Sequence, residues 1–371
     1  MAAEPTERAV VGLSLSPTWL RGAAWRRGDS DVEAVLSGDA LIAAAQAAEA
    51  AGAAFVFRPD HLALDPSVLR EWPGATGLDP IVLMTAIARE TDRIGLVPTY
   101  STRFAPPYLV ARELQSLDRI SRGRAGWNAV TSRAGAGNFS DAAAPADDGY
   151  RDARDMIAVV RRLQASYPAS ALRIDREGGV FADPESTVRI EPAGRFDVSG
   201  PLTVPAWRDD PMPLLHAGGS PASRELAAAD ADAIFAMTAD VDAGAALRED
   251  LAERTAAWGR EPGAVRVLPG LVLCLAESRI DAEELYAQAR ASTGGGAAHA
   301  TVVGTPQDAV DEIIRRLDAG AADGVIALPY GHRGSIDLLA ERVIPTLAAR
   351  GRLVPPTDDL RAAMRGGAAA P

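Results

Sequence analysis

The stretch LDPIVLMTAIARETDRIGLVPTYSTRFAPPYLVARELQSLDRISRGRAGWNAVTS, residues 78–132, decides the fold of this chain. Residues 80–90 carry apolar side chains at helical spacing, and residues 93–98 form a short apolar run typical of a strand. The same alternation returns in residues 108–118 and 124–130. Helices and strands alternating at this length indicate parallel strands joined by helical crossovers. Polar residues at the C-terminal ends of these strands are expected where such folds bind ligands.

The same alternation extends over most of the chain and predicts a (β/α)8 TIM barrel with an inserted β-hairpin segment. We expect a single domain over residues 1–355 and a C-terminal tail, residues 356–371, that is partly disordered. The insertion covers about 167–210, with hairpin strands near 188–190 and 196–198. The eight barrel strands are predicted at residues 9–15, 53–57, 93–98, 124–130, 211–217, 233–237, 265–275 and 324–328.

Composition excludes several classes of function. The net charge of −12 argues against a nucleic-acid partner, which requires a basic surface. All 38 basic residues are arginine, so a Schiff-base lysine, a pyridoxal-phosphate site and a P-loop lysine are excluded. The single Cys274 permits no internal disulfide. Because no signal segment and no membrane-spanning apolar run is evident, we expect a cytoplasmic protein without a membrane partner.

The turn Gly218-Gly219-Ser220-Pro221 is the ligand site that the residues themselves indicate most clearly. Two glycines follow a predicted strand, a serine stands at the N-cap position of the next helix, and a proline stands at its first position. Free N–H groups at such a helix start suit a phosphate. The alternative interpretation is an ordinary capped turn between a strand and a helix.

Several motifs together resemble those of the bacterial luciferase-like flavin-dependent monooxygenases. The branch is the one that contains nitrilotriacetate monooxygenase and dibenzothiophene-sulfone monooxygenase. The resemblance covers nearly the whole chain. It rests on SRGRAGWNAVTS (121–132), AWR (24–26), RIGL (93–96) with Thr99 and Ser101-Thr102, PY (107–108) with Ala111-Arg112, Asn138-Phe139, AGGS (217–220), ADAIF (231–235) and, more weakly, Val343-Ile344-Pro345 and Arg350-Gly351.

This resemblance implies a two-component oxygenase. FMN as FMNH2 would come from a separate NAD(P)H:flavin reductase, and O2 is the co-substrate. One oxygen atom would pass to a small organic substrate through a flavin hydroperoxide. A homodimer or homotetramer is expected. Two alternatives stay open: a deazaflavin (F420)-dependent oxidoreductase of the same superfamily, and a catalytically silent flavin-binding protein.

The resemblance also implies a set of cofactor-binding residues. The turn at Gly219 and Ser220, together with Tyr150, would hold the FMN phosphate. Asp60, Thr99, Asn128 and Ser132 would line the flavin, although each alone is more often a turn residue or helix cap. The chain departs from the family at Ala146, where a phosphate-contacting histidine is usual.

The histidines and aromatic residues give weaker predictions. The four histidines share no metal-site spacing, so no metal is expected. No catalytic residue is assigned, although His332 is a candidate acid or base. The aromatic residues predicted at or beside strand ends are candidates for the substrate pocket: Trp19, Trp25, Tyr100, Phe104, Trp127 and Tyr330.

Overall fold

Eight parallel strands close into a barrel in the computed structural model, which describes residues 7–132, 134–139, 149–192, 194–290 and 299–364. The predicted TIM barrel is therefore confirmed. In order around the barrel the strands are β1 (Val10–Ser14), β2 (Phe55–Arg58), β3 (Gly95–Ser101), β4 (Trp127–Val130), β7 (Leu214–Ala217), β8 (Ala233–Ala236), β9 (Arg266–Leu275) and β11 (Gly324–Pro329).

Helices such as α3 (Pro80–Glu90) and α9 (Pro306–Asp318) lie around the barrel and bury an apolar face against its strands. Helix α3 shows how the sequence sets these helices: Asp79 caps it by accepting from the backbone N–H groups of Ile81 and Val82, and Leu83 and Ile87 are buried. The described helices are α1 (Val32–Ser37), α2 (Asp39–Ala51), α3 (Pro80–Glu90), α4 (Pro107–Ser121), α5 (Gly149–Ala165), α6 (Pro221–Asp230), α7 (Val241–Ala257), α8 (Arg279–Arg290), α9 (Pro306–Asp318), α10 (Gly334–Leu338), α11 (Ile344–Ala349) and α12 (Leu360–Met364).

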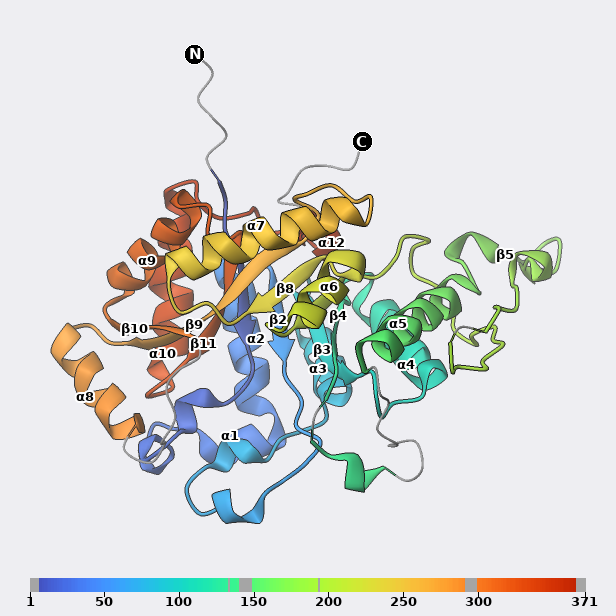
Figure 1. Cartoon of the computed structure of the whole chain (residues 1–371). Coiled ribbons are helices and arrows are strands. Elements are labelled where there is room, and N and C mark those ends of the chain that lie inside the picture. The colour runs from blue at the N-terminus through green and yellow to red at the C-terminus, as the bar shows by residue number, and fades with distance from the viewer. Residues whose placement is uncertain (1–6, 133, 140–148, 193, 291–298, 365–371) are drawn as a thin grey trace.

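The N-terminal end of the barrel is plugged by α12, which lies at the opposite end of the barrel from α1 in Figure 1. Leu360 is buried within the barrel's own apolar cluster, beside Gly95 and Gly126. A Cβ at Gly95 would lie 2.7 Å from Leu360 Cδ1, and one at Gly126 would lie 2.8 Å from Leu360 Cδ2. The glycines thus make room for the plug, and the C-terminal end is left for a ligand.

The inserted hairpin exists, but the sequence-based prediction placed it wrongly. The antiparallel pair is β5 (Leu172–Asp175) with β6 (Val180–Ala182), beyond α4 and α5 in Figure 1. Asp175 fixes its turn by accepting from the N–H of Gly178 at 2.9 Å. The described residues on either side of residue 193, 188–192 and 194–198, form no hairpin, and three of their apolar side chains pack on the main core: Ile190, Phe196 and Val198.

A further strand, β10 (Ala300–Gly304), was missed. It pairs in parallel with Leu271–Leu275 in the second half of β9, whereas the first half of β9 pairs with β8. Strand β10 therefore extends the sheet outside the barrel. Every second residue of β10 is buried, but the segment ATVVG has only five residues and contains just one polar side chain, so its sequence alone carries little signal.

Candidate functional site

Two hydroxyl groups meet at the glycine turn before α6. Ser220 caps α6, because its Oγ accepts from the backbone N–H of Ser223 at 3.2 Å. The same Oγ lies 3.1 Å from the phenolic oxygen of Tyr150 on α5. A Cβ at Gly219 would meet no atom within 4 Å, so the protein leaves open space beside this turn. Tyr150, Ser220 and Gly219, all predicted from the sequence, are thus brought together.

The buried His216 supports the start of α6, next to this turn. Its Nδ1 lies 2.7 Å from the backbone oxygen of Ala129 in β4, and its Nε2 lies 2.8 Å from Ser223 Oγ in α6. Burial lowers the pKa of His216, which favours the neutral imidazole. In that form Nδ1–H donates to Ala129 and Nε2 accepts from Ser223. The role of Ser223 was not predicted, because no sequence pattern pairs a helix serine with a histidine seven residues earlier.

A second predicted pair lies on neighbouring strands. Thr99 of β3 is directly opposite Asn128 of β4, and Asn128 Nδ2 donates to Thr99 Oγ1 at 3.0 Å. Both side chains are buried. The Asn128 Oδ1 atom is also buried and has no hydrogen-bond partner within the described residues. Leaving a buried amide oxygen without a hydrogen bond destabilises the fold, so Oδ1 is a candidate contact for an N–H group of a ligand.

Asp60 and Ser132 lie apart from these two pairs. Asp60 follows β2, accepts from the N–H of His61 at 2.9 Å, and has its pKa raised by burial. With Arg58 and His61 it lines a small pocket between the loops after β1 and β2. The backbone oxygen of Ser132 accepts from Arg103 at 3.2 Å. Within the residues that the structure describes, neither Asp60 nor Ser132 forms a hydrogen bond or ion pair with another predicted site residue.

The loops at the C-terminal end of the barrel are tied to one another. Phe104, after β3, stacks on Phe139, after β4, with ring centroids 4.9 Å apart and planes 4° apart. Asn138 Nδ2 donates to the backbone oxygen of Leu62 in the loop after β2 at 2.7 Å. These contacts explain the Asn138-Phe139 motif, because the two residues join three loops that border the site.

Several weaker candidates have contacts that favour structural roles. His332 Nε2 is 2.7 Å from the backbone oxygen of Leu275, Tyr100 donates to Glu113 at 2.7 Å, and Trp127 is buried in the core. These contacts therefore give no support to a role for Tyr100 or Trp127 in the substrate pocket, or for His332 as an acid or base. Ala146, where the family histidine would stand, lies outside the described residues.

The described residues contain neither a candidate metal site nor a candidate membrane-spanning helix. No group of three or more His, Cys, Asp or Glu side chains there is placed to hold a metal ion. No helix in the same residues is long and apolar enough to span a membrane.

Comparisons with known proteins agree with this architecture. A family model described as luciferase-like monooxygenase matches residues 23–328. The chain is 27% identical, over 416 aligned residues, to N-acetyl-S-(2-succino)cysteine monooxygenase of Bacillus subtilis (strain 168), with 92% of each chain covered. It is 29% identical to dibenzothiophene-sulfone monooxygenase of Rhodococcus erythropolis, covering 88% of this chain and 89% of that one.

A further relative matches only part of the chain: nitrilotriacetate monooxygenase component A of Aminobacter aminovorans is 38% identical over 213 residues, 56% of this chain and 47% of that one. Among solved structures, the EDTA monooxygenase of Chelativorans sp. BNC1 superposes with a TM-score of 0.84 at 24% identity, covering 96% of this chain and 98% of that one. An F420-dependent secondary alcohol dehydrogenase superposes with a TM-score of 0.63 at 14% identity, covering 90% and 98%. The shared fold alone therefore does not separate monooxygenases from F420-dependent dehydrogenases.

Proposed function

Because the chain belongs to the luciferase-like monooxygenase family, we propose that it is the oxygenase component of a two-component system. It would take FMNH2 from a separate NAD(P)H:flavin reductase and use O2 to insert one oxygen atom into a small organic substrate. The observation that carries the proposal is the meeting of Tyr150 and Ser220 at the open Gly219 turn.

The chemistry of this turn fits the FMN phosphate. The start of α6 offers backbone N–H groups and partial positive charge to an anion. The hydroxyl groups of Ser220 and Tyr150 are further donors, and Gly219 leaves room for a ligand to approach the backbone. We propose that these three residues hold the phosphate.

The Thr99–Asn128 pair fits the polar part of the flavin. Asn128 Nδ2 is already used by Thr99, so the free Oδ1 is left as an acceptor. An N–H donor, such as the one on the pyrimidine edge of the isoalloxazine ring, would satisfy it. We propose that Asn128, Thr99 and Asp60 line this edge or the ribityl chain, with Ser132 at the border of the site.

The protein's own contribution is binding, orientation and exclusion of water. Reduced FMN, when bound, supplies the electrons and the oxygen-transfer chemistry with O2. The Phe104–Phe139 stack and the Asn138–Leu62 bond hold the bordering loops together, which limits access of water. Burial raises the pKa of Asp60, so its carboxyl group keeps a proton to a higher pH than an exposed aspartate does.

The substrate and the oligomeric state remain predictions. The relatives that match over most of their length act on chemically different compounds, as their names state. We propose only a small organic substrate. The homodimer or homotetramer that the resemblance implies is likewise carried forward as a proposal.

A reductase-coupled assay tests the two-component function. The purified chain should consume no NADH with FMN alone. With a separate reductase, NADH and FMN, it should raise oxygen consumption above the reductase-only rate when a substrate is supplied. Steady oxidation of NADH by the chain and FMN without a reductase would contradict the proposal.

A further inference from the structure

We propose that Arg224 is a positioning residue for the phosphate turn, the glycine turn at residues 218–221 that would bind the FMN phosphate. Asp250 on the neighbouring helix α7 holds Arg224 in place. This inference rests on the proposed FMN site, and it adds residues that lie outside the set predicted from the sequence.

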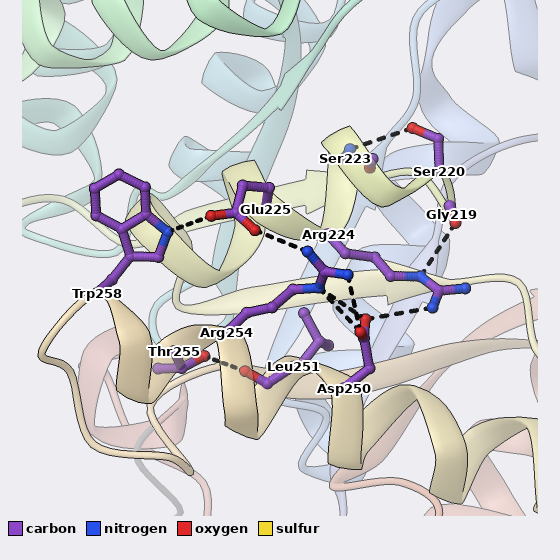
Figure 2. Close-up of polar contacts among 10 residues, drawn as sticks. All are labelled: Gly219, Ser220, Ser223, Arg224, Glu225, Asp250, Leu251, Arg254, Thr255 and Trp258. Atoms are coloured by element: carbon purple, nitrogen blue, oxygen red, sulfur yellow. Dashed lines mark hydrogen bonds and ion pairs between the residues drawn. The ribbon is translucent and has the colours of Figure 1, made fainter.

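Arg224 lies in the first part of α6 and its side chain folds back toward the turn. Its Nε donates to the backbone oxygen of Gly219 at 3.2 Å, and its Nη1 lies 3.3 Å from Asp250 Oδ2. Figure 2 shows the guanidinium group between Gly219 and Asp250. One side chain therefore connects the turn to a second helix.

The contact with Gly219 fixes the orientation of one peptide group. The peptide bond between Gly219 and Ser220 is planar and trans, so its C=O and N–H point in opposite directions. When Arg224 holds the Gly219 oxygen, the Ser220 N–H must point to the other side of the turn. Gly219 has the widest choice of backbone conformations, and this bond restricts it. The donor that faces a phosphate would then be oriented before the ligand binds, which lowers the entropic cost of binding.

Asp250 is itself held by a second arginine. Arg254 Nε is 3.0 Å from Asp250 Oδ1, and Arg254 Nη1 is 2.8 Å from Glu225 Oε2 on α6. Glu225 also accepts from Trp258 Nε1 at 2.7 Å. Figure 2 shows this chain of contacts running from Trp258 to Gly219.

These groups are partly exposed, so each ion pair alone stabilises the fold little. Together, the contacts that run from Trp258 to Arg224 restrict the conformations of the Arg224 side chain. Removing these contacts is therefore expected to weaken phosphate binding much more than it lowers the free energy of unfolding.

The experiment compares FMN with riboflavin, which lacks the phosphate. Dissociation constants for both are measured by fluorescence titration of the full chain, together with the melting temperature. The variants are Arg224→Met, which keeps the stem but removes the donors, Arg224→Lys, and Asp250→Asn. Arg248→Met is the matched control. Arg248 lies on α7, as Asp250 does, but it pairs with Asp323 at 2.9 Å, away from the turn.

We expect Arg224→Met to weaken FMN binding by about tenfold, as for loss of a hydrogen bond from a charged donor, with riboflavin binding unchanged. Asp250→Asn should give a smaller loss with the same selectivity, and Arg224→Lys should not restore binding, because a lysine lacks the forked geometry. Arg248→Met should leave the FMN-to-riboflavin ratio at the wild-type value.

Different results would contradict the phosphate site and the role of Arg224. Wild-type protein that binds FMN and riboflavin equally would contradict the phosphate site itself. Wild-type selectivity that persists in folded Arg224→Met and Asp250→Asn would overturn the role of Arg224. If Arg224→Met does not fold, Asp250→Asn and Arg224→Lys decide the question by the same ratio.

Discussion

The hydroxyl groups of Tyr150 and Ser220 lie 3.1 Å apart although the two residues are 70 positions apart in the sequence. They meet because α5 and α6 are neighbouring helices, with Tyr150 in the first turn of α5 and Ser220 capping α6. Two donors at the start of a helix are suited to a phosphate group.

Replacing Ser220 by alanine should weaken FMN binding as well as the fold. Loss of the cap costs about 0.5–2 kcal/mol of stability. The matched control is Thr305→Ala, because Thr305 caps α9 and is also followed by a proline. Both variants should melt earlier, but only Ser220→Ala should raise the Kd for FMN in a titration. Equal FMN affinity in wild type and Ser220→Ala would show that Ser220 is only a cap.

A methyl group at Gly219 should obstruct the ligand without disturbing the empty protein. A Cβ at this position meets no protein atom within 4 Å, and the same is true of Gly263, which serves as the control. Gly219→Ala should keep the wild-type melting temperature within about 2 °C, since surface changes are usually small. Its affinity for FMN should fall by about tenfold or more, whereas Gly263→Ala should bind normally. Unchanged binding by Gly219→Ala would place the phosphate elsewhere.

Acid should destabilise the wild-type protein more than His216→Gln. The folded-state pKa of His216 is lowered by burial, so below the unfolded-state value of about 6.5 the unfolded chain binds the extra proton first. The stability from neutral His216 is present above about pH 6.5 and is lost as the pH falls toward the folded-state pKa. Glutamine can keep a donor for Ala129 and an acceptor for Ser223 without titrating.

Denaturant unfolding at pH 7.5 and 5.5 measures this difference. The unfolding free energy of the wild type should fall by on the order of 1 kcal/mol more than that of His216→Gln over this interval. Parallel losses in the two proteins would mean that His216 does not contribute to the acid sensitivity.

Restoring the family histidine as Ala146→His should tighten FMN binding. A protonated imidazole near the phosphate would add a charge-assisted hydrogen bond, worth roughly 1.5–3 kcal/mol or about tenfold in affinity or more. Because the ordinary His pKa is about 6.5, the gain over wild type should be larger at pH 6 than at pH 8. Calorimetric titration of both proteins at each pH checks this, and no gain at either pH would place position 146 away from the phosphate.

Sequence reasoning was most successful where local patterns act alone. The bounds of α3 were predicted to the residue, since Asp79-Pro80 is a strong helix start. The hairpin was misplaced because short apolar runs resemble strands, whereas Ile190, Phe196 and Val198 pack on the core without forming one, which only the tertiary structure reveals.

At the candidate site, too, local features were predictable and tertiary contacts were not. The Ser220 cap was evident from the sequence, and the Thr99–Asn128 pair follows from the barrel register. The bond between Arg224 and Gly219 was not predictable, because an arginine in the first part of a helix has many partners available to it. The ligand contacts of all seven predicted site residues, Asp60 and Ser132 included, remain predictions.

The measurement that tests the proposed function most directly is an anaerobic titration of the chain with reduced FMN, reduced riboflavin and reduced F420. Anaerobic conditions keep each cofactor reduced, so that binding is separated from reaction with O2. We predict that reduced FMN binds, that reduced riboflavin binds at least tenfold more weakly because it lacks the phosphate, and that reduced F420 does not compete. Binding of reduced F420 together with no binding of reduced FMN would contradict the assignment of this chain as an FMNH2-dependent monooxygenase.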